Sequence, residues 1–175
     1  MVDLEAGWQT ERLDLEPLIA EHAAELAPAL DDLSLHEFTG GTPLSASALT
    51  TRYRHLATRR SPDGEQLWGN WALRSRETGT AVGTVQATLP TRGPGAGQAE
   101  IAWVVATAAQ SHGYAKEAAR SLADRLCESG WSVAAYIHPR HVASQHVARA
   151  ARMVPTDATR DGEQRWIRAP AASAP

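Results

Sequence analysis

The chain has a single cysteine and little net charge. Cys127 has no partner for an internal disulfide, which suits a reducing cytoplasm. The formal net charge of −3 gives no electrostatic reason to expect nucleic acid as a partner. We therefore expect a cytoplasmic protein that does not bind nucleic acid.

Long hydrophobic runs are also missing. No apolar run approaches the roughly 20 residues that span a bilayer, and the acidic start lacks the apolar core of a signal peptide. We therefore expect no association with membranes. The 175 residues are 43% apolar, which fits one globular domain with a real core. We place this domain at residues 1–168 and expect residues 169–175, rich in Ala and Pro, to be a disordered tail.

Residues 98–126 are the most informative stretch, because they predict a strand, a tight turn and a helix. Residues 99–105 are apolar and have the length of a strand. After the turn, apolar residues recur with the spacing of an amphipathic helix. They are Ala115, Ala118, Ala119, Leu122, Ala123 and Leu126.

The turn at residues 110–115 favours an anion. The first N–H groups of a helix lack intrahelical acceptors and lie at the positive end of the helix dipole. Gly113 can adopt a positive φ and has no side chain to block a phosphate. The turn is neither a Walker loop nor a dinucleotide-binding fingerprint, since Gly113 is its only glycine. A plain strand-to-helix connection is the alternative.

The rest of the chain predicts more strands than helices. Helical spacing marks residues 18–30, a second helix capped by Ser45 or Ser47, and residues 142–152. The expected strands are residues 12–17, 68–76, 81–89, 133–137, 154–159 and 164–168. The helical crossover implies that residues 133–137 run parallel to residues 99–105. The prediction is an α/β fold whose mixed, mostly antiparallel twisted sheet is flanked by helices.

Four segments in register resemble one known family. Gln110-x-x-Gly113-x-Ala115 resembles the Q/R-x-x-G-x-G/A pyrophosphate loop of the GCN5-related N-acetyltransferases (GNAT). The residues around this loop, residues 137–148 and residues 10–18 resemble the RimJ/RimL-type branch. The resemblance runs from about residue 10 to residue 168. It implies the GNAT fold, acetyl-CoA as cosubstrate, no metal, and direct transfer of the acetyl group to a primary amine in a ternary complex.

The resemblance also implies which residues contact the cosubstrate. They are Gln110, Ser111, His112, Gly113, Tyr114 and Ala115 of the turn, the backbone of Val104 and Val105, and His141 and Ser144. Five positions depart from the family pattern, and two of them are Ser111 and Arg152, each of which stands where the family commonly has glycine. His141 stands where asparagine is usual, Ala148 stands where many relatives have a tyrosine that protonates the leaving thiolate, and His112 stands where Lys or Arg is common.

Two side chains are candidates for catalysis. Glu100 lies on an otherwise apolar strand just before the expected cofactor end, so it could take the proton of the amine. Alternatively, it is a salt-bridged or solvated residue. Ser144 matches a serine that RimL-like enzymes place near the sulfur, where its hydroxyl could protonate the thiolate. Alternatively, it satisfies backbone N–H groups at a helix start.

Phe38, Trp71 and Trp103 are the candidate acceptor contacts. Trp71 lies on a strand that runs beside the acceptor pocket in the family, and Trp103 lies on the central strand. Phe38 belongs to a loop where relatives build the acceptor rim. Core packing is the alternative for the tryptophans. His138, His141 and His146 do not have the spacing of a zinc motif, so we expect no metal.

Three functions remain open at this stage. The first is an N-acetyltransferase acting on a small-molecule amine or a protein N-terminus. The second is a CoA-binding regulatory module that has lost catalysis, for which the departures at His141 and Ala148 argue. The third is a homodimeric scaffold; a homodimer is also open for the enzyme.

Overall fold

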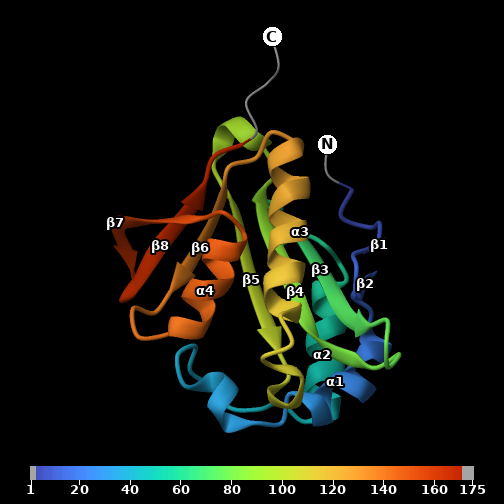
Figure 1. The fold of residues 1–175 in the computed structure, drawn as a ribbon. Helices are drawn as coiled ribbons and strands as arrows, with labels where there is room; N and C mark the ends of the chain where they lie inside the picture. The colour runs from blue at the N-terminus through green and yellow to red at the C-terminus, as the bar shows by residue number, and fades with distance from the viewer. Residues whose placement is uncertain (1–2, 171–175) are drawn as a thin grey trace.

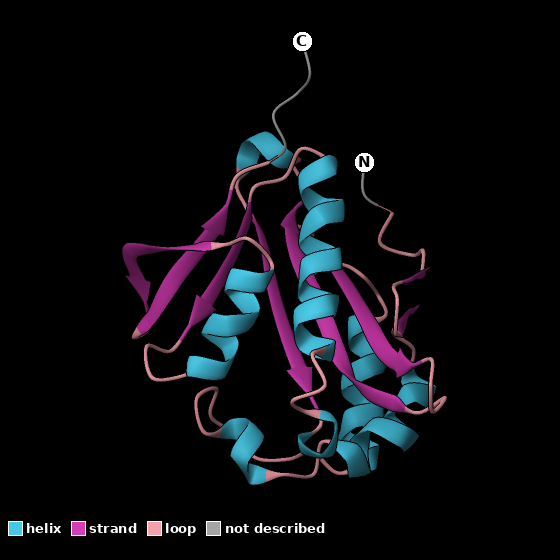
Figure 2. Ribbon diagram, viewed as in Figure 1, coloured by secondary structure: helices cyan, strands magenta, loops and turns pink. Residues whose placement is uncertain are grey.

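A computed structural model describes residues 3–170 as one eight-stranded sheet with helices on both faces (Figures 1 and 2). The strands are β1 (Trp8–Gln9), β2 (Leu13–Pro17), β3 (Gln66–Ser75), β4 (Ala81–Pro90), β5 (Ala99–Val105), β6 (Val133–Ile137), β7 (Val154–Arg160) and β8 (Glu163–Arg168). The helices are α1 (Ala23–Ala29), α2 (Ala46–Leu56), α3 (Tyr114–Glu128) and α4 (Val142–Ala150). Short 3-10 turns are η1 (Ala20–His22), η2 (Leu33–His36), η3 (Pro94–Ala96) and η4 (Thr107–Ala109).

The sheet has the order β1-β2-β3-β4-β5-β6-β8-β7. Every neighbouring pair is antiparallel except β5 and β6, which are parallel and are joined through α3. The predicted mixed, mostly antiparallel α/β fold is therefore confirmed.

The helices bury apolar stripes on opposite faces of the sheet. α3 and α4 pack on one face, in the larger core, and the predicted stripe of α3 is buried there except for Ala115, which is partly buried. α1 and α2 pack on the other face, where Leu26, Leu49 and Tyr53 join Ala72 of β3 in a smaller core. Alternation along the strands sorts side chains between these two faces.

Local signals place most element ends as expected. Ser45 caps α2 by accepting from the N–H of Ala48, and Gly130 has a φ of +86° just after α3. Asp161 and Gly162 both have positive φ in the β7–β8 hairpin. Gly83 lies next to a register shift between β3 and β4. A Cβ there would come within 2.1 Å of the Val104 carbonyl oxygen, so only glycine fits.

Four short elements were not predicted from the sequence, and two of them are the 3-10 turns η3 and η4. β1 is only two residues long, and η2 lies in the loop between α1 and α2. Of the predicted tail, Ala169 accepts a hydrogen bond from the Cys127 thiol, whereas residues 171–175 lie outside the described residues. Between residues 3 and 170, no helix has both the length and the apolar character needed to cross a bilayer.

Candidate functional site

The central feature of the site is a gap between β5 and β6. The two strands pair only at Ala99 with Val133 and at Glu100 with Ala134. β5 continues to Val105 and β6 to Ile137, and the strands diverge over this length (Figure 1). The facing edges of both strands are therefore left without backbone partners in the sheet, in the middle of the molecule.

Alternation decides which residues of β5 face the gap. The Ala99 N–H donates to Ser132 at 2.9 Å, so odd-numbered residues turn their N–H and C=O groups toward β6. The Val105 carbonyl follows this rule and accepts from the Gln110 amide at 3.2 Å. Val104 instead points its carbonyl at Gly83 of β4. The backbone of Val104 therefore faces β4 and not the gap, contrary to the prediction, whereas the backbone groups of Trp103 and Val105 face the gap.

The turn between β5 and α3 presents a row of free donors. The Gln110 N–H bonds within η4, and the next N–H with a backbone acceptor is that of Glu117, which donates to Gly113 at 3.0 Å. Among the described residues, the six N–H groups of residues 111–116 have no backbone acceptor. They lie at the N-terminus of the 15-residue α3, where the helix dipole favours an anion.

Left-handed backbone conformations shape this turn. Ser111 has a φ of +65° and Gly113 a φ of +81°. Alternation of left- and right-handed residues curls successive N–H groups toward one side, which makes a concave anion site. The side chain of Tyr114 turns away into the core, where its hydroxyl meets Ser75 at 3.3 Å. The group that Tyr114 offers to a ligand is therefore its backbone N–H.

The face of β5 that carries Glu100 is open. Ala72, Thr84 and Val104 are in register across β3, β4 and β5, so even-numbered residues of β5 share the face that α1 and α2 cover further along the sheet. The smaller core under those helices includes no residue of β5, and Ala102 is exposed in the middle of this central strand. A second molecule could lie on this surface against the start of the gap.

Glu100 lies where the gap begins and is held by an arginine. Both of its carboxylate oxygens accept from Arg160 of β7, at 2.6 and 2.9 Å. The Arg160 guanidinium also lies over the ring of Tyr136 on β6, 3.6 Å from its centroid. The hydrogen bonds that Arg160 donates to Glu100 raise the pKa of Arg160, so this residue remains a cation at any working pH.

A second carboxyl group shares this surface. Glu163 of β8 lies across the hairpin from Arg160. Burial raises the pKa of Glu163, and this outweighs the opposing influence of Arg160 and His138. A carboxylate with a raised pKa is a better proton acceptor near neutral pH, so Glu163 competes with Glu100 for the role of base.

Phe38 and His141 meet at the far end of the gap. The Phe38 ring stacks on His141 with centroids 4.5 Å apart and lies 5.2 Å from His138. At the other end of η2, the Thr107 hydroxyl donates to Asp32 at 2.6 Å. The η2 segment therefore runs from the end of β5 to the turn after β6.

Ser144 is half-buried in the first turn of α4. The N-cap of this helix is His141, so Ser144 does not cap it. Ala148, one helical turn later, is fully buried, and its methyl group fills the position where many relatives have a tyrosine. Of the two residues, only Ser144 carries a hydroxyl.

The two tryptophans occupy the opposite face. Trp71 has no exposed surface, and its indole N–H donates to the Ala6 carbonyl at 3.0 Å inside the α3-side core. The prediction that Trp71 contacts the acceptor is therefore corrected. Trp103 shares that face through its register with Val85 but is only half-buried, next to the gap. It can line the gap from the α3 side, not from the open face.

Sequence reasoning missed Tyr136, Arg160 and Glu163. Alternation shows that Tyr136 points to one face of its strand, but it does not show that the β7–β8 hairpin folds back beside β5. Within residues 3–170, no group of three or more His, Cys, Asp or Glu side chains is placed to hold a metal ion.

Comparison with known proteins agrees with this geometry. The family model described as acetyltransferase (GNAT) domain matches residues 12–169. The search of curated proteins found no match. The similar solved structures include an acetyltransferase of the GNAT family from Bacillus anthracis, which is 15% identical with a TM-score of 0.74. That alignment covers 95% of this chain and all of the other.

Several similar structures contain a ligand of the CoA type, and RimJ and MccE are two of them. RimJ from Mycobacterium smegmatis, in complex with CoA-disulfide, is 17% identical with a TM-score of 0.72, over 90% of this chain and 81% of that one. The microcin self-immunity acetyltransferase MccE, in complex with acetyl-CoA and AMP, is 12% identical with a TM-score of 0.73, over 91% and 93%. At these identities the likeness establishes the fold.

Proposed function

Because the chain belongs to the GNAT acetyltransferase family, we propose that it transfers the acetyl group of acetyl-CoA directly to a primary amine. The observation that carries the proposal is the row of six free N–H groups at residues 111–116, next to the unpaired edge of β5. A pyrophosphate fits the first feature, and the amide groups of a pantetheine arm fit the second.

The cosubstrate would be held mainly by backbone groups. The N–H groups of the turn would bind the pyrophosphate, and Trp103 and Val105 would pair with the pantetheine amides along the gap. The thioester would then lie where the gap narrows, near Glu100 and Ala134. Gln110 supports this arrangement by holding the Val105 carbonyl.

Glu100 would remove the proton of the amine. An alkylammonium has a pKa of about 10.4, so it needs a base near neutral pH. The ion pair with Arg160 limits how the amine can approach, because an incoming ammonium must share the Glu100 carboxylate with this guanidinium. The open face at Ala102 gives the amine its path to that carboxylate.

In the transfer step, the amine nitrogen bonds to the thioester carbon and the carbon–sulfur bond breaks. The released thiolate takes a proton, for which the Ser144 hydroxyl is the proposed donor. An acyl-cysteine intermediate is disfavoured, because Cys127 is buried at the end of α3 and burial raises the pKa of its thiol. Direct transfer in a ternary complex is the mechanism that these residues support.

The acceptor is proposed only by class. The RimJ/RimL-type sequence pattern supports a small-molecule amine or a protein N-terminus. A single domain over residues 1–168, a cytoplasmic location and a homodimer belong to the same proposal. Phe38, with Trp103 on the other face of β5, is the proposed aromatic contact for the acceptor or acyl group.

Isothermal titration with acetyl-CoA, with NAD as control ligand, tests the proposal first. One-site binding to acetyl-CoA alone, followed by thiol release in an amine screen, is the expected result. Binding without turnover for any amine class would favour the regulatory module. An absence of both heat and thermal stabilisation would overturn the transferase and favour the scaffold.

A further inference from the structure

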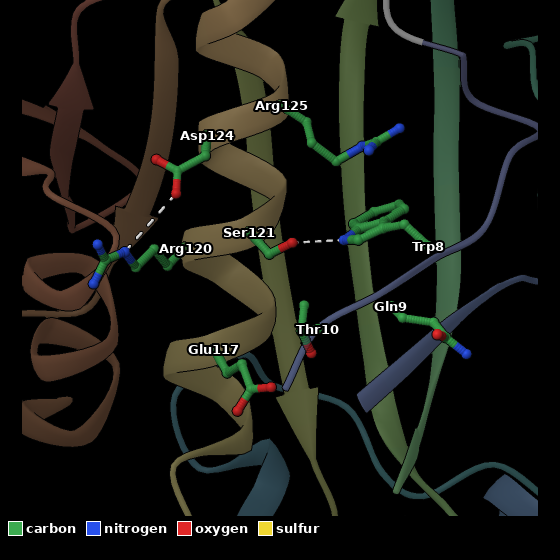
Figure 3. Close-up of a pocket in the computed structure, with 8 residues that line it drawn as sticks. All are labelled: Trp8, Gln9, Thr10, Glu117, Arg120, Ser121, Asp124 and Arg125. Carbon is green, nitrogen blue, oxygen red and sulfur yellow. Dashed lines mark hydrogen bonds and ion pairs between the residues drawn. The ribbon is translucent and has the colours of Figure 1, made fainter. Parts of the chain in front are cut away.

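The N-terminal segment, residues 8–12, lies along the outer side of α3. Figure 3 shows Trp8 reaching Ser121 and Thr10 lying next to Glu117, one turn apart on the helix. The Arg125 guanidinium covers the Trp8 ring at 4.6 Å. This segment and α3 border a groove of about 400 Å³. The segment therefore runs beside α3 toward the turn at residues 110–115, which precedes this helix.

Arg12 ends this segment and reaches the turn itself. Its Nε donates to the Glu117 carboxylate at 2.7 Å, and its backbone N–H donates to the other oxygen at 2.8 Å. Its Nη1 donates to the carbonyl oxygen of His112 at 2.6 Å. One guanidinium thus connects the first turn of α3 to the loop before it, across 100 residues of sequence.

The bond to His112 has a geometric consequence. In a trans peptide, the C=O and the following N–H point in opposite directions. Because Arg12 holds the His112 carbonyl on its own side, the Gly113 N–H is turned away from Arg12. A flip of this peptide would replace a donor with a carbonyl oxygen, which repels a phosphate.

The His112 side chain acts on an earlier peptide of the same turn. Its Nδ1 lies 2.8 Å from the Gln110 carbonyl and 3.3 Å from that of Ala109. Since carbonyls only accept, Nδ1 carries the proton and donates. By the same geometry, the Ser111 N–H is turned away from the Gln110 carbonyl. The imidazole is therefore occupied in holding the turn rather than facing a ligand.

We infer that Arg12 is a positioning residue for phosphate binding, which sets the Gly113 peptide with its N–H toward the ligand, and that His112 does the same for Ser111. This inference rests on the proposed function, since it names what prepares the proposed pyrophosphate site. The Arg12–Glu117 pair is neutral as a unit, so its contribution is orientation rather than added positive charge.

NMR titration of Arg12→Gln with CoA and with pantetheine, which lacks the pyrophosphate, tests the inference. We expect the Kd for CoA to rise about tenfold, in proportion to a lost charged hydrogen bond, and the Kd for pantetheine to stay the same. The backbone amide signal of Gly113 should move in the free variant. Arg12→Lys should resemble Arg12→Gln, because a single ammonium lacks the fork that spans Glu117 and His112.

Arg76→Gln is the matched control. Arg76 donates to the carbonyls of Thr10 and Glu11 in the same segment, yet it does not contact the turn. It should bind both ligands like the parent protein. Amide dispersion in the same spectra confirms that each variant is folded.

Three outcomes would contradict the claims made here, and they separate the inference from the proposed function. If the parent protein prefers CoA to pantetheine and Arg12→Gln keeps that preference, the inference about Arg12 is wrong and the proposed function stands. An equal loss for both ligands would also reject a role specific to phosphate. If the parent protein shows no preference for CoA, the pyrophosphate site itself is wrong.

Discussion

The turn at residues 110–115 and the open face around Glu100 are built in different ways. The turn offers backbone N–H groups from one continuous segment, so its donors survive the departures at Ser111 and His112. The open face combines side chains from four strands, and each substitution there changes its chemistry. The lesson is that a site made of backbone N–H groups keeps its donors when exposed side chains change, whereas a site made of side chains does not.

Glu100→Gln gives the largest expected effect on activity. It changes the region that is built from side chains. Loss of a general base should lower kcat by about 100-fold while the Kd for CoA stays the same. The loss should shrink as the pH approaches the pKa of the amine, because less of the amine then needs deprotonation. Steady-state rates from about pH 6 to about pH 9 measure both effects.

Glu163→Gln is the matched variant for the base. It removes the neighbouring carboxylate on the same face and leaves the Glu100–Arg160 pair in place. It should keep most of the activity. If Glu163→Gln loses turnover and Glu100→Gln does not, the roles of the two carboxylates are reversed.

Gly113→Val changes the turn, which is built from backbone groups, and we expect it to give the second-largest effect, a loss of CoA affinity. A β-branched residue at a φ of +81° is strained, and its Cβ would lie 3.1 Å from an Arg12 nitrogen. A penalty of about 2 kcal/mol on the binding conformation corresponds to a Kd for CoA about 30-fold higher. Gly162→Val, at a φ of +83° in the distant hairpin, controls for strain alone. Equal Kd values in a folded Gly113→Val would contradict the loop assignment.

Ser144→Ala tests the weaker of the two catalytic candidates. A neutral hydroxyl is a modest acid, and water can replace it, so kcat should fall by only about three- to tenfold. CoA binding should change little. Ser121→Ala, which removes the hydroxyl that contacts Trp8 on the outer side of α3, should leave kcat at the parent value. No change in kcat for Ser144→Ala would leave protonation of the thiolate to water.

His141→Asn gives the smallest effect, and it appears in the pH dependence of stability. Burial lowers the pKa of His141 and is reinforced by His138, although Glu37 opposes it. The folded state therefore binds fewer protons than the unfolded state, whose pKa is about 6.5. This contribution is complete above that pKa and is lost as the pH falls through the lowered value. The Tm of the parent protein should drop more steeply on acidification than that of His141→Asn, whereas exposed His146→Asn should follow the parent.

Most of the fold could be predicted from the sequence because its elements are marked locally. The apolar stripe of α3 and the glycines at 113, 130 and 162 define their own elements. The α3 crossover fixes the parallel pair. β1 is missed because a strand of two residues is too short to show an alternation of apolar and polar side chains. η2 is missed because its turn packs against segments distant in sequence.

Only those parts of the site could be predicted that follow from the spacing of motif residues or from the alternation of side chains along a strand. Spacing located the turn, and alternation put Glu100 and Trp103 on opposite faces. Alternation did not show with which neighbouring strand the backbone of Val104 forms hydrogen bonds, because that depends on the register of the strands. Nor did it separate buried Trp71 from a surface residue. The contacts of Arg12 and Arg160 join segments far apart in the chain, and only the folded structure brings them together.

The β7–β8 hairpin places Arg160 and Glu163 on the rim of the sheet, on either side of a two-residue turn. Six of the seven residues of β7 are exposed, so substitutions there cost little folding free energy. The same rim lies apart from the turn that would hold the cosubstrate. Residues of this hairpin can therefore be substituted without disturbing the turn, so that the two regions can diverge independently in evolution.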